Sequence, residues 1–230
     1  MKGKWKEFNL GELGFLKSSG VDKLFRDGEK VSKLVNYMDV YKYSVIDNNF
    51  ELSKTTVNSQ QIVSFDLREG DVLFTPSSET PDDIGHSSVV IDDLINTVYS
   101  YHLIRLRDTS NLLDTAFKAY VFKENSVLKQ FSQKAAGSTR YTLTKGSFEK
   151  TIVSFPKDKI YQQKIAKILN TIDAVIEKTE QAIAKYQAIK KGMMHDLFTR
   201  GIDLKTGKLR PSYEEAPELY KESELGMISK

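Results

Sequence analysis

Three histidines, His86, His102 and His195, have the side chains best suited to acid–base or metal chemistry near neutral pH. They lie far apart in the sequence, and none has the spacing that is typical of metal ligands, so we expect no metal site. The pair Ser77–Ser78 precedes His86 and could supply a nucleophile. No G-x-S-x-G motif surrounds the pair, however, and the pattern therefore does not indicate a hydrolase.

Two other segments partly match catalytic or nucleotide-binding motifs. Residues 81–83, Pro-Asp-Asp, could open a metal-dependent nuclease motif, but no nearby Glu-x-Lys completes it and an acidic loop is the simpler interpretation. In residues 201–209 the spacer is one residue too long for a phosphate-binding loop, and Leu209 stands where Ser or Thr would hold magnesium. There is no G-x-G-x-x-G motif for a dinucleotide. We therefore predict that the chain is not an enzyme and needs no cofactor.

The composition is that of a globular protein, since 40% of the 230 residues are hydrophobic and 28% are charged. Apolar runs are too short for a membrane-spanning helix. The basic start, residues 1–6, is not followed by an apolar run, which argues against a secretory signal. The chain has no Cys, so disulfides and thiolate zinc sites are excluded, and we predict a cytoplasmic protein.

The net charge of +3 conceals an uneven distribution. Residues 66–93 carry one Arg against eight acidic side chains, whereas residues 117–150 and 185–210 each carry seven basic against two acidic side chains. Each run taken alone can be an ordinary solvated face. Two basic segments in one chain nevertheless make a nucleic-acid partner worth testing.

The first part of the chain mixes the periodicities of strands and helices. Short apolar runs bounded by turn residues predict strands at residues 33–37, 61–65, 71–74, 88–91, 101–106 and 151–155. Hydrophobic residues on one helical face predict helices around residues 112–121 and 127–135. We expect an α+β globule of about 155 residues, which is large enough to bury its own core.

Residues 158–199 have the pattern of one continuous helix. Asp158 is a good N-cap after Pro156, Gly201 is a good C-terminal stop, and no Pro interrupts the segment. Hydrophobic residues recur at heptad spacing over about four heptads. A helix of about 40 residues is roughly 60 Å long.

The apolar seam of this helix is too long for the globule to cover. We therefore predict a partner helix from a second copy of the chain; the alternative is that the helix folds back on its own domain. The residues predicted to form the dimerisation seam are Ile165, Ile168, Leu169, Ile172, Val175, Ile176, Ile183, Tyr186 and Ile189.

The long helix and its tail carry the most specific strings of the sequence. They are IAKILNTID (165–173), IKKGMMHDLFTRGI (189–202), GKLRPSY (207–213) and ESELGMI (222–228). These strings strongly resemble the conserved helical region of the specificity (S) subunits of type I restriction–modification systems. The entry to the helix, residues 155–158, departs from the Pro-Pro-leading entry that is usual in that family.

Two strings of the N-terminal part, GDVLFTPSS (70–78) and AGSTRY (136–141), resemble the target recognition domain of the same family. The resemblance implies a DNA-binding target recognition domain at 1–156, a long dimerisation and spacer helix at 157–200, and a tail at 201–230. A full-length member has two recognition domains and two antiparallel helices. Residues 224–228 resemble residues 11–15, so we expect half an S subunit, ending at the start of a second repeat.

The resemblance implies a binding protein that chooses a two-part DNA site for other subunits. The implied partners are double-stranded DNA, a methyltransferase (M) subunit, a restriction (R) subunit and a second copy of the chain. On this interpretation the candidate DNA-binding residues are Thr75, Ser77, Ser78, Ser138, Thr139, Arg140, Tyr141 and Lys145. Arg140 is the strongest candidate, because a guanidinium can bind guanine or phosphate through two hydrogen bonds. We also expect basic residues of 117–150 to neutralise phosphates.

Alternatives to these assignments remain. Ser77–Ser78 could be an ordinary polar turn, and Tyr141 could be a core residue of a strand. Lys190 and Lys191, with Arg200 and Arg210, could contact the M subunit or DNA; the two lysines could also simply complement the helix dipole. The chain as a whole could instead be a coiled-coil dimeric DNA-binding regulator, or a truncated fragment that does not read DNA.

Overall fold

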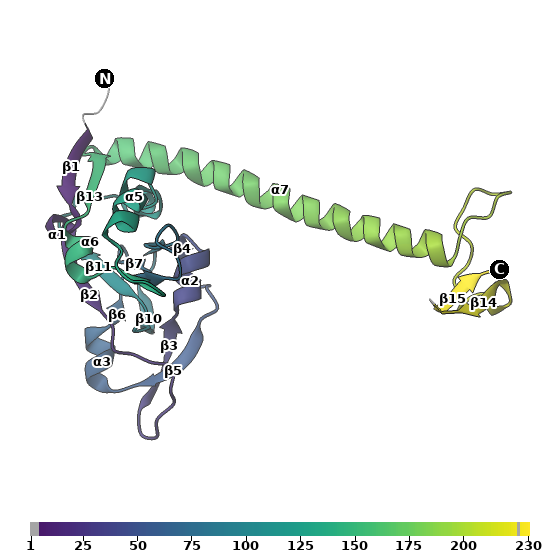
Figure 1. The fold of residues 1–230 in the computed structure, drawn as a ribbon, viewed down its shortest axis with the longest axis horizontal. Helices are drawn as coiled ribbons and strands as arrows, with labels where there is room; N and C mark the ends of the chain where they lie inside the picture. The colour runs from purple at the N-terminus through teal and green to yellow at the C-terminus, as the bar shows by residue number, and fades with distance from the viewer. Residues whose placement is uncertain (1–4, 225) are drawn as a thin grey trace. The chain divides into compact units, whose positions relative to one another are not determined.

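The computed structural model describes residues 5–224 and 226–230. The chain forms two compact units, residues 1–168 and 169–230, which we describe separately. The long helix α7 (Lys159–Thr199) begins in the first unit and ends in the second (Figure 1). Among the described residues, no helix has the length and apolar character needed to cross a membrane.

The first unit is built on two mixed β-sheets. In the five-stranded sheet, of order β2-β11-β7-β9-β4, the strands are β2 (Gly14–Ser18), β4 (Val45–Ile46), β7 (Val72–Phe74), β9 (Ser87–Val90) and β11 (Ile104–Asp108). In the four-stranded sheet, of order β5-β3-β10-β6, they are β3 (Lys30–Val35), β5 (Ser53–Val57), β6 (Asp66–Leu67) and β10 (Leu94–Tyr99). The pairs β3·β10 and β4·β9 are parallel and the other pairs of these sheets are antiparallel.

Two antiparallel ribbons and six short helices complete this unit. The ribbons are β1 (Trp5–Asn9) with β13 (Ile152–Pro156), and β8 (Ser77–Ser78) with β12 (Tyr141–Thr142). The helices are α1 (Leu10–Leu13), α2 (Tyr37–Lys42), α3 (Ser59–Ser64), α4 (Thr115–Val121), α5 (Asn125–Lys134) and α6 (Lys145–Glu149). The α+β class expected from the sequence is therefore confirmed.

The largest hydrophobic core lies where the five-stranded sheet meets α4, α5 and α6. Phe74 is fully buried at its centre, with ring centroids 5.3 Å from Phe122, 6.1 Å from Phe131 and 5.3 Å from Phe148. Such a cluster of rings fixes how the helices sit on the sheet. It thereby fixes the loops that these helices and strands carry.

One predicted strand is wrong. Residues 61–64 belong to α3 instead, and Phe65 is its C-cap, because Asn58 and Gln61 form a reciprocal capping box. The Asn58 side chain accepts from Gln61 N–H at 2.9 Å, and the Gln61 side chain accepts from Asn58 N–H at 3.0 Å. The sequence pattern also missed β10. Asn96 adopts a positive φ of 52° there, and the strand register shifts between Leu94 and Val98, which hides the alternation of a strand.

The long helix begins and ends where the sequence predicts. The Asp158 carboxylate accepts a 2.9 Å hydrogen bond from Ile160 N–H, and Gly201, two residues after the last helical residue, adopts a φ of +71°. Gln162 is fully buried and anchors the first turns: its amide nitrogen donates to Leu112 O at 2.9 Å and to Pro156 O at 2.7 Å. The start of α7 is therefore fixed to the rest of the first unit.

The second unit contains the remainder of α7, a 3-10 turn (Pro217–Leu219) and a hairpin of β14 (Tyr220–Ser223) and β15 (Gly226–Ser229). Tyr220 is buried and its ring packs edge-on against Tyr213, with 5.9 Å between the centroids. The segment 224–228, expected to open a second repeat, contributes Gly226, Met227 and Ile228 to β15 of this hairpin, and Leu225 lies outside the described residues.

Candidate nucleic-acid interface

A short hairpin follows α5. Ala136 and Thr142 exchange backbone hydrogen bonds of 3.0 and 2.9 Å, so the residues between them form the turn. Thr142 also belongs to β12, and in the β8/β12 ribbon it pairs with Ser77. Ser77 and Tyr141 lie 64 residues apart in the sequence. The two strings that resemble a target recognition domain therefore meet in one ribbon.

Gly137 allows this turn. Its φ is +148°, and a Cβ at this position would lie 2.0 Å from the carbonyl oxygen of Arg140. No L-residue with a side chain fits there without moving the loop. The glycine thus closes a tight turn that exposes Ser138, Thr139 and Arg140.

The predicted DNA-binding residues divide into exposed and buried groups. Ser138, Thr139 and Arg140 are exposed at the turn, and Ser77 is half-buried beside them. Thr75 is fully buried and Ser78 is 6% exposed, which argues against their direct contact with DNA.

The last two predicted residues also have internal partners. Tyr141 is half-buried and packs against the largest core. Lys145 is exposed on α6, where it pairs with Glu149 at 3.5 Å. Of the predicted residues, the three at the turn and Lys145 are therefore the exposed ones, and within the described part of the chain only those at the turn have no ion-pair partner of this kind.

Four residues that the sequence analysis did not assign to the interface lie beside the ribbon. The hydroxyl of Tyr37, on α2, donates to Ser77 O at 2.8 Å. One turn further along α2, the hydroxyl of Tyr41 donates to the Asp83 carboxylate at 3.1 Å, and His86 contacts the same carboxylate at 2.7 Å. The rings of Tyr41 and His86 lie 4.4 Å apart. The i, i+4 spacing of the two tyrosines was the one local signal that could have found them.

Electrostatic coupling extends this surface toward a neighbouring loop. Burial lowers the pKa of His102, and the positive charges of Arg140 and Lys23 lower it further. Burial raises the pKa of Tyr37. The charges of Arg140, on the turn after α5, and of Lys23, on the loop between β2 and β3, thus both act on His102. We call Tyr37, Tyr41, Ser77, Asp83, His86, His102, Ser138, Thr139 and Arg140 the ribbon surface.

Two carboxylates of the acidic segment 66–93 are paired with arginines inside the fold. Asp66 contacts Arg68 at 2.6 Å and both Arg105 and Arg107 at 3.2 Å. Asp71 pairs with Arg107 at 2.7 Å. The segment therefore does not present all eight negative charges to an approaching polyanion.

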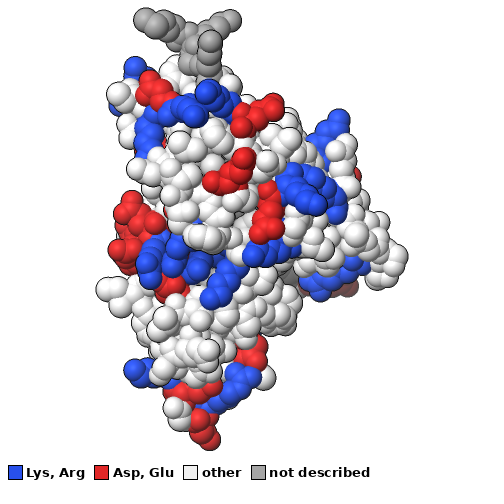
Figure 2. All heavy atoms as spheres, turned by 90° about the vertical axis from the view of Figure 1, so that its left-hand side faces the viewer, with Lys and Arg blue, Asp and Glu red and all other residues white. Residues whose placement is uncertain are grey.

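The basic segment 117–150 is also partly committed to the fold. Lys118 is buried and pairs with Asp108 at 3.0 Å, and Lys134 donates to Lys150 O at 3.1 Å. The expectation that the basic residues of this segment neutralise phosphates is wrong for Lys118, because its charge is already paired away from solvent. Figure 2 shows the face that carries β1, α1 and β2, where basic and acidic side chains are interspersed.

The predicted dimerisation seam is exposed along most of its length. Ile165 is half-buried against the core of the first unit, so the free seam starts after it. The exposed fractions are 61% for Ile168, 49% for Ile172, 59% for Val175, 50% for Ile176, 52% for Ile183, 70% for Tyr186 and 45% for Ile189. Leu169 is half-buried. Within the described part of the second unit, nothing covers this stripe.

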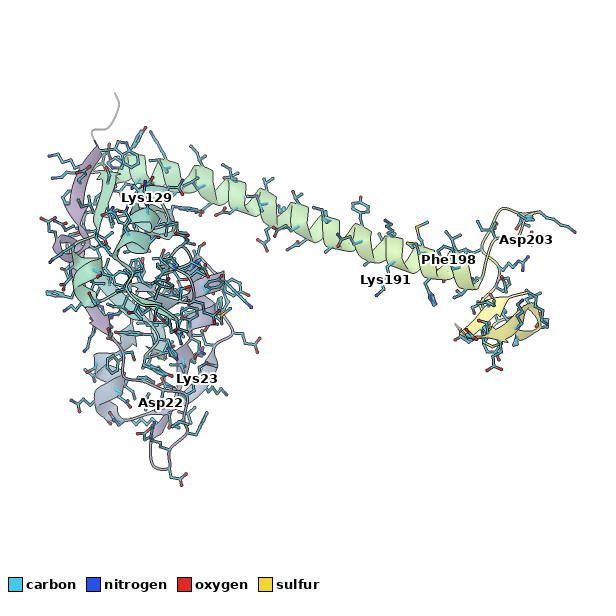
Figure 3. All side chains as sticks on the ribbon, viewed as in Figure 1. Asp22, Lys23, Lys129, Lys191, Phe198 and Asp203 are labelled. Carbon is cyan, nitrogen blue, oxygen red and sulfur yellow. The ribbon has the colours of Figure 1, made fainter. Side chains whose placement is uncertain are left out.

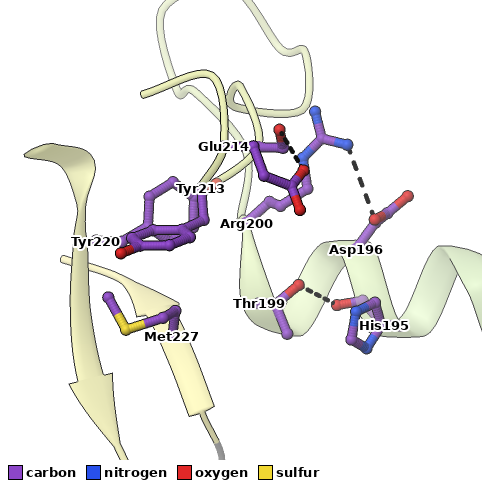
Figure 4. Close-up of a pocket in the computed structure, with 9 residues that line it drawn as sticks. His195, Asp196, Thr199, Arg200, Tyr213, Glu214, Tyr220 and Met227 are labelled. Atoms are coloured by element: carbon purple, nitrogen blue, oxygen red, sulfur yellow. Dashed lines mark hydrogen bonds and ion pairs between the residues drawn. The ribbon is translucent and has the colours of Figure 1, made fainter. Parts of the chain in front are cut away.

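A polar hollow of about 420 Å³ lies within the second unit (Figure 4). Arg200 bridges its wall, pairing with Asp196 at 3.8 Å and donating from Nε to Arg210 O at 2.8 Å. Figure 3 shows Lys191 and Phe198 projecting from the same end of α7. Within the described part of the chain, no group of three or more His, Asp or Glu side chains could hold a metal ion.

Comparisons with known sequences and with solved structures point to the same family. The model of the type I restriction modification DNA specificity domain matches residues 2–186. A putative type I restriction enzyme MjaX specificity subunit from Methanocaldococcus jannaschii is 25% identical over 191 residues, covering 80% of this chain and 44% of that protein. The chain thus spans less than half the length of this relative.

Solved structures show the same fold at low sequence identity. The S subunit of a type I system from M. genitalium is 17% identical with a TM-score of 0.52, over 86% of this chain and 46% of that one. The HsdS subunit from Thermoanaerobacter tengcongensis is 17% identical with a TM-score of 0.57, over 88% and 52%. A chain from a structure of type I R-M complex assembly and conformational transition is 16% identical with a TM-score of 0.59, over 84% and 44%.

Proposed function

The chain belongs to the family of type I restriction–modification DNA specificity domains, and from this membership we propose that it is the non-catalytic subunit that chooses the DNA site. Residues 1–156 would recognise DNA, residues 157–200 would act as spacer and dimerisation helix, and residues 201–230 would form the tail. A methyltransferase subunit and a restriction subunit would supply the chemistry. Such an assembly acts on DNA, in keeping with a cytoplasmic location.

The observation that carries the proposal is the β8/β12 ribbon with its exposed turn. Gly137 shapes a tight turn whose tip presents Ser138, Thr139 and Arg140 together. A two-stranded ribbon is narrow enough to enter the major groove of B-DNA, where every base pair shows a distinct pattern of donors and acceptors. The turn therefore has a suitable shape to contact base edges in the major groove.

The polar groups of the ribbon surface are chemically diverse. Arg140 can donate two hydrogen bonds to guanine O6 and N7, or bind a phosphate. The Asp83 carboxylate, held by Tyr41 and His86, can accept from the amino group of cytosine. The hydroxyls of Ser138 and Thr139 can either donate or accept a hydrogen bond. We infer that contacts from these side chains select bases, while basic residues around them fix the position on the backbone.

We further propose that two copies associate through α7. The exposed stripe from Ile168 to Ile189 is typical of a coiled-coil seam, and an apolar stripe of this length is unfavourable in water. A twofold dimer places two identical ribbon surfaces on one duplex, so the target would consist of two inverted half-sites.

The proposal is tested by mapping methylated adenines in cells that express the cognate methyltransferase subunit, with and without this chain. We expect methylation at one bipartite, symmetric sequence only when the chain is present. Methylation that is unchanged by the chain would contradict the proposal. A protein carrying Arg140→Ala serves as the matched variant, since it should reduce methylation at that sequence.

A further inference from the structure

An exposed apolar tip lies on the loop between β2 and β3. Leu24 is 62% exposed and Phe25 is 64% exposed, although both are large hydrophobic side chains. Adjacent apolar side chains at this exposure commonly mark a contact with another molecule. Asp22 and Lys23, which are labelled in Figure 3, directly precede them in the sequence.

The loop is held in place by the body of the domain. Asp22 and Arg26 form a bidentate ion pair with a shortest distance of 2.6 Å, and the Asp22 side chain also accepts from Leu24 N–H at 3.0 Å. The buried Thr55 hydroxyl donates to Asp22 O at 2.9 Å, and Thr56 accepts from Arg26 N–H at 2.8 Å. The two apolar side chains are therefore presented by a fixed loop that cannot easily turn them inward.

The tip adjoins the ribbon surface. A hollow of about 550 Å³ is lined by Leu24, Lys23 and the exposed Tyr101. The ring of Tyr101 lies 3.8 Å from that of His102, and His102 feels the charges of both Lys23 and Arg140. Through Tyr101 and His102 the apolar tip adjoins the ribbon surface, and the cation of Lys23 lies in the same hollow as Leu24.

We propose that Leu24 and Phe25 form a wedge that inserts between base pairs of the bound duplex and locally unstacks them, an inference that rests on the proposed function. Apolar side chains flanked by basic residues are used in this way by proteins that kink DNA. Lys23 would hold the adjacent phosphate, and Tyr101 would offer a stacking surface to the displaced base. The domain would then recognise the deformability of a base step besides its hydrogen-bonding pattern.

The test uses duplexes that the full wild-type chain selects from a random-sequence library. Permanganate oxidation of unstacked thymines, together with 2-aminopurine fluorescence at successive adenines, reports unstacking. We expect one reactive step in the wild-type complex. The double variant Leu24→Ser/Phe25→Ser should lose that reactivity and bind at least tenfold more weakly.

Two variants serve as matched controls, Phe15→Ser on β2 and Val63→Ser on α3, because these side chains are 72% and 77% exposed elsewhere in the domain. They should leave both affinity and reactivity unchanged, and thermal melting should show that all variants fold. Selection of no duplex by the wild-type chain would overturn the proposed function and the wedge together. Selected duplexes that stay fully stacked, or a double variant that binds them as the wild type does, would overturn the wedge alone and point to a protein partner for the tip.

Discussion

Arg140 illustrates how a single side chain acquires its role from its neighbours. It is exposed on a turn that only glycine at position 137 permits, and its charge acts on His102 and Tyr37 nearby. Thr75 shows the opposite case. Its position beside Ser77 in the sequence suggested contact with DNA, but the backbone pairing of Thr75 with His86 and Gly85 places it inside the fold.

Arg140→Ala should weaken binding to the selected duplex by about tenfold or more, because a bidentate contact to guanine contributes roughly 1–3 kcal/mol of discrimination. If Arg140 binds a phosphate instead, the slope of the logarithm of affinity against the logarithm of salt concentration should decrease in magnitude by about one. Titrations at several salt concentrations measure both quantities. Lys6→Ala on β1 removes the same charge elsewhere and is the control; equal effects of the two variants would exclude a specific role for Arg140.

A second prediction at this scale concerns acid stability. Burial alone would raise the pKa of Asp66, but Arg68 and Arg107 together hold it below its ordinary value. A carboxylate with a lowered pKa in the folded state stabilises the fold above its unfolded pKa, and this stabilisation is lost as the pH falls through the folded pKa. Unfolding of the wild-type chain should therefore become easier below about pH 4. Asp66→Asn should be less stable at neutral pH and less sensitive to acid, as measured by chemical denaturation across pH; an unchanged pH dependence would contradict this.

Among the elements, the junction between the first unit and the start of α7 depends on buried polar contacts. Gln162 lies inside the protein, where it donates to two backbone carbonyls and accepts from Asp114 N–H at 2.7 Å. Its neighbour Gln163 is exposed and donates to the Asp114 carboxylate at 2.9 Å. Two adjacent residues of the same type thus have different structural roles.

Gln162→Ala should lower the free energy of unfolding by at least about 2 kcal/mol, because each buried group left without a partner costs about 1–3 kcal/mol. Gln163→Ala should change it by less than about 1 kcal/mol, since its hydrogen bond is exposed to water. Urea denaturation followed by circular dichroism measures both values. Similar losses for the two variants would show that the buried contacts do not stabilise the junction.

For the whole molecule, the exposed seam of α7 leads to a prediction about association. Ile172→Asp/Ile176→Asp places two charges in the seam, and a buried unpaired charge is strongly unfavourable. The wild-type chain should sediment as a dimer at micromolar concentration and the double variant as a monomer. Gln181→Asp lies at another heptad position and should remain dimeric. A monomeric wild-type chain, with and without DNA, would contradict the dimer.

Local signals in the sequence were sufficient for the long helix, its caps at Asp158 and Gly201, and the helical faces that became α4 and α5. Heptad spacing and end signals are properties of neighbouring residues, and they need no knowledge of the rest of the fold. The same holds for the family strings. Where local chemistry was ambiguous, as at residues 61–65, a capping box outweighed the strand-like composition.

Tertiary structure decided the composition of the ribbon surface. Ser77, Tyr37 and the turn with Arg140 come from separate segments, and the β8/β12 pairing together with the Tyr37–Ser77 hydrogen bond brings them together. It also decided that Lys118 is buried and that Leu24 is exposed. Burial depends on which faces of the elements meet in the core, and the spacing of residues along one segment does not contain that information.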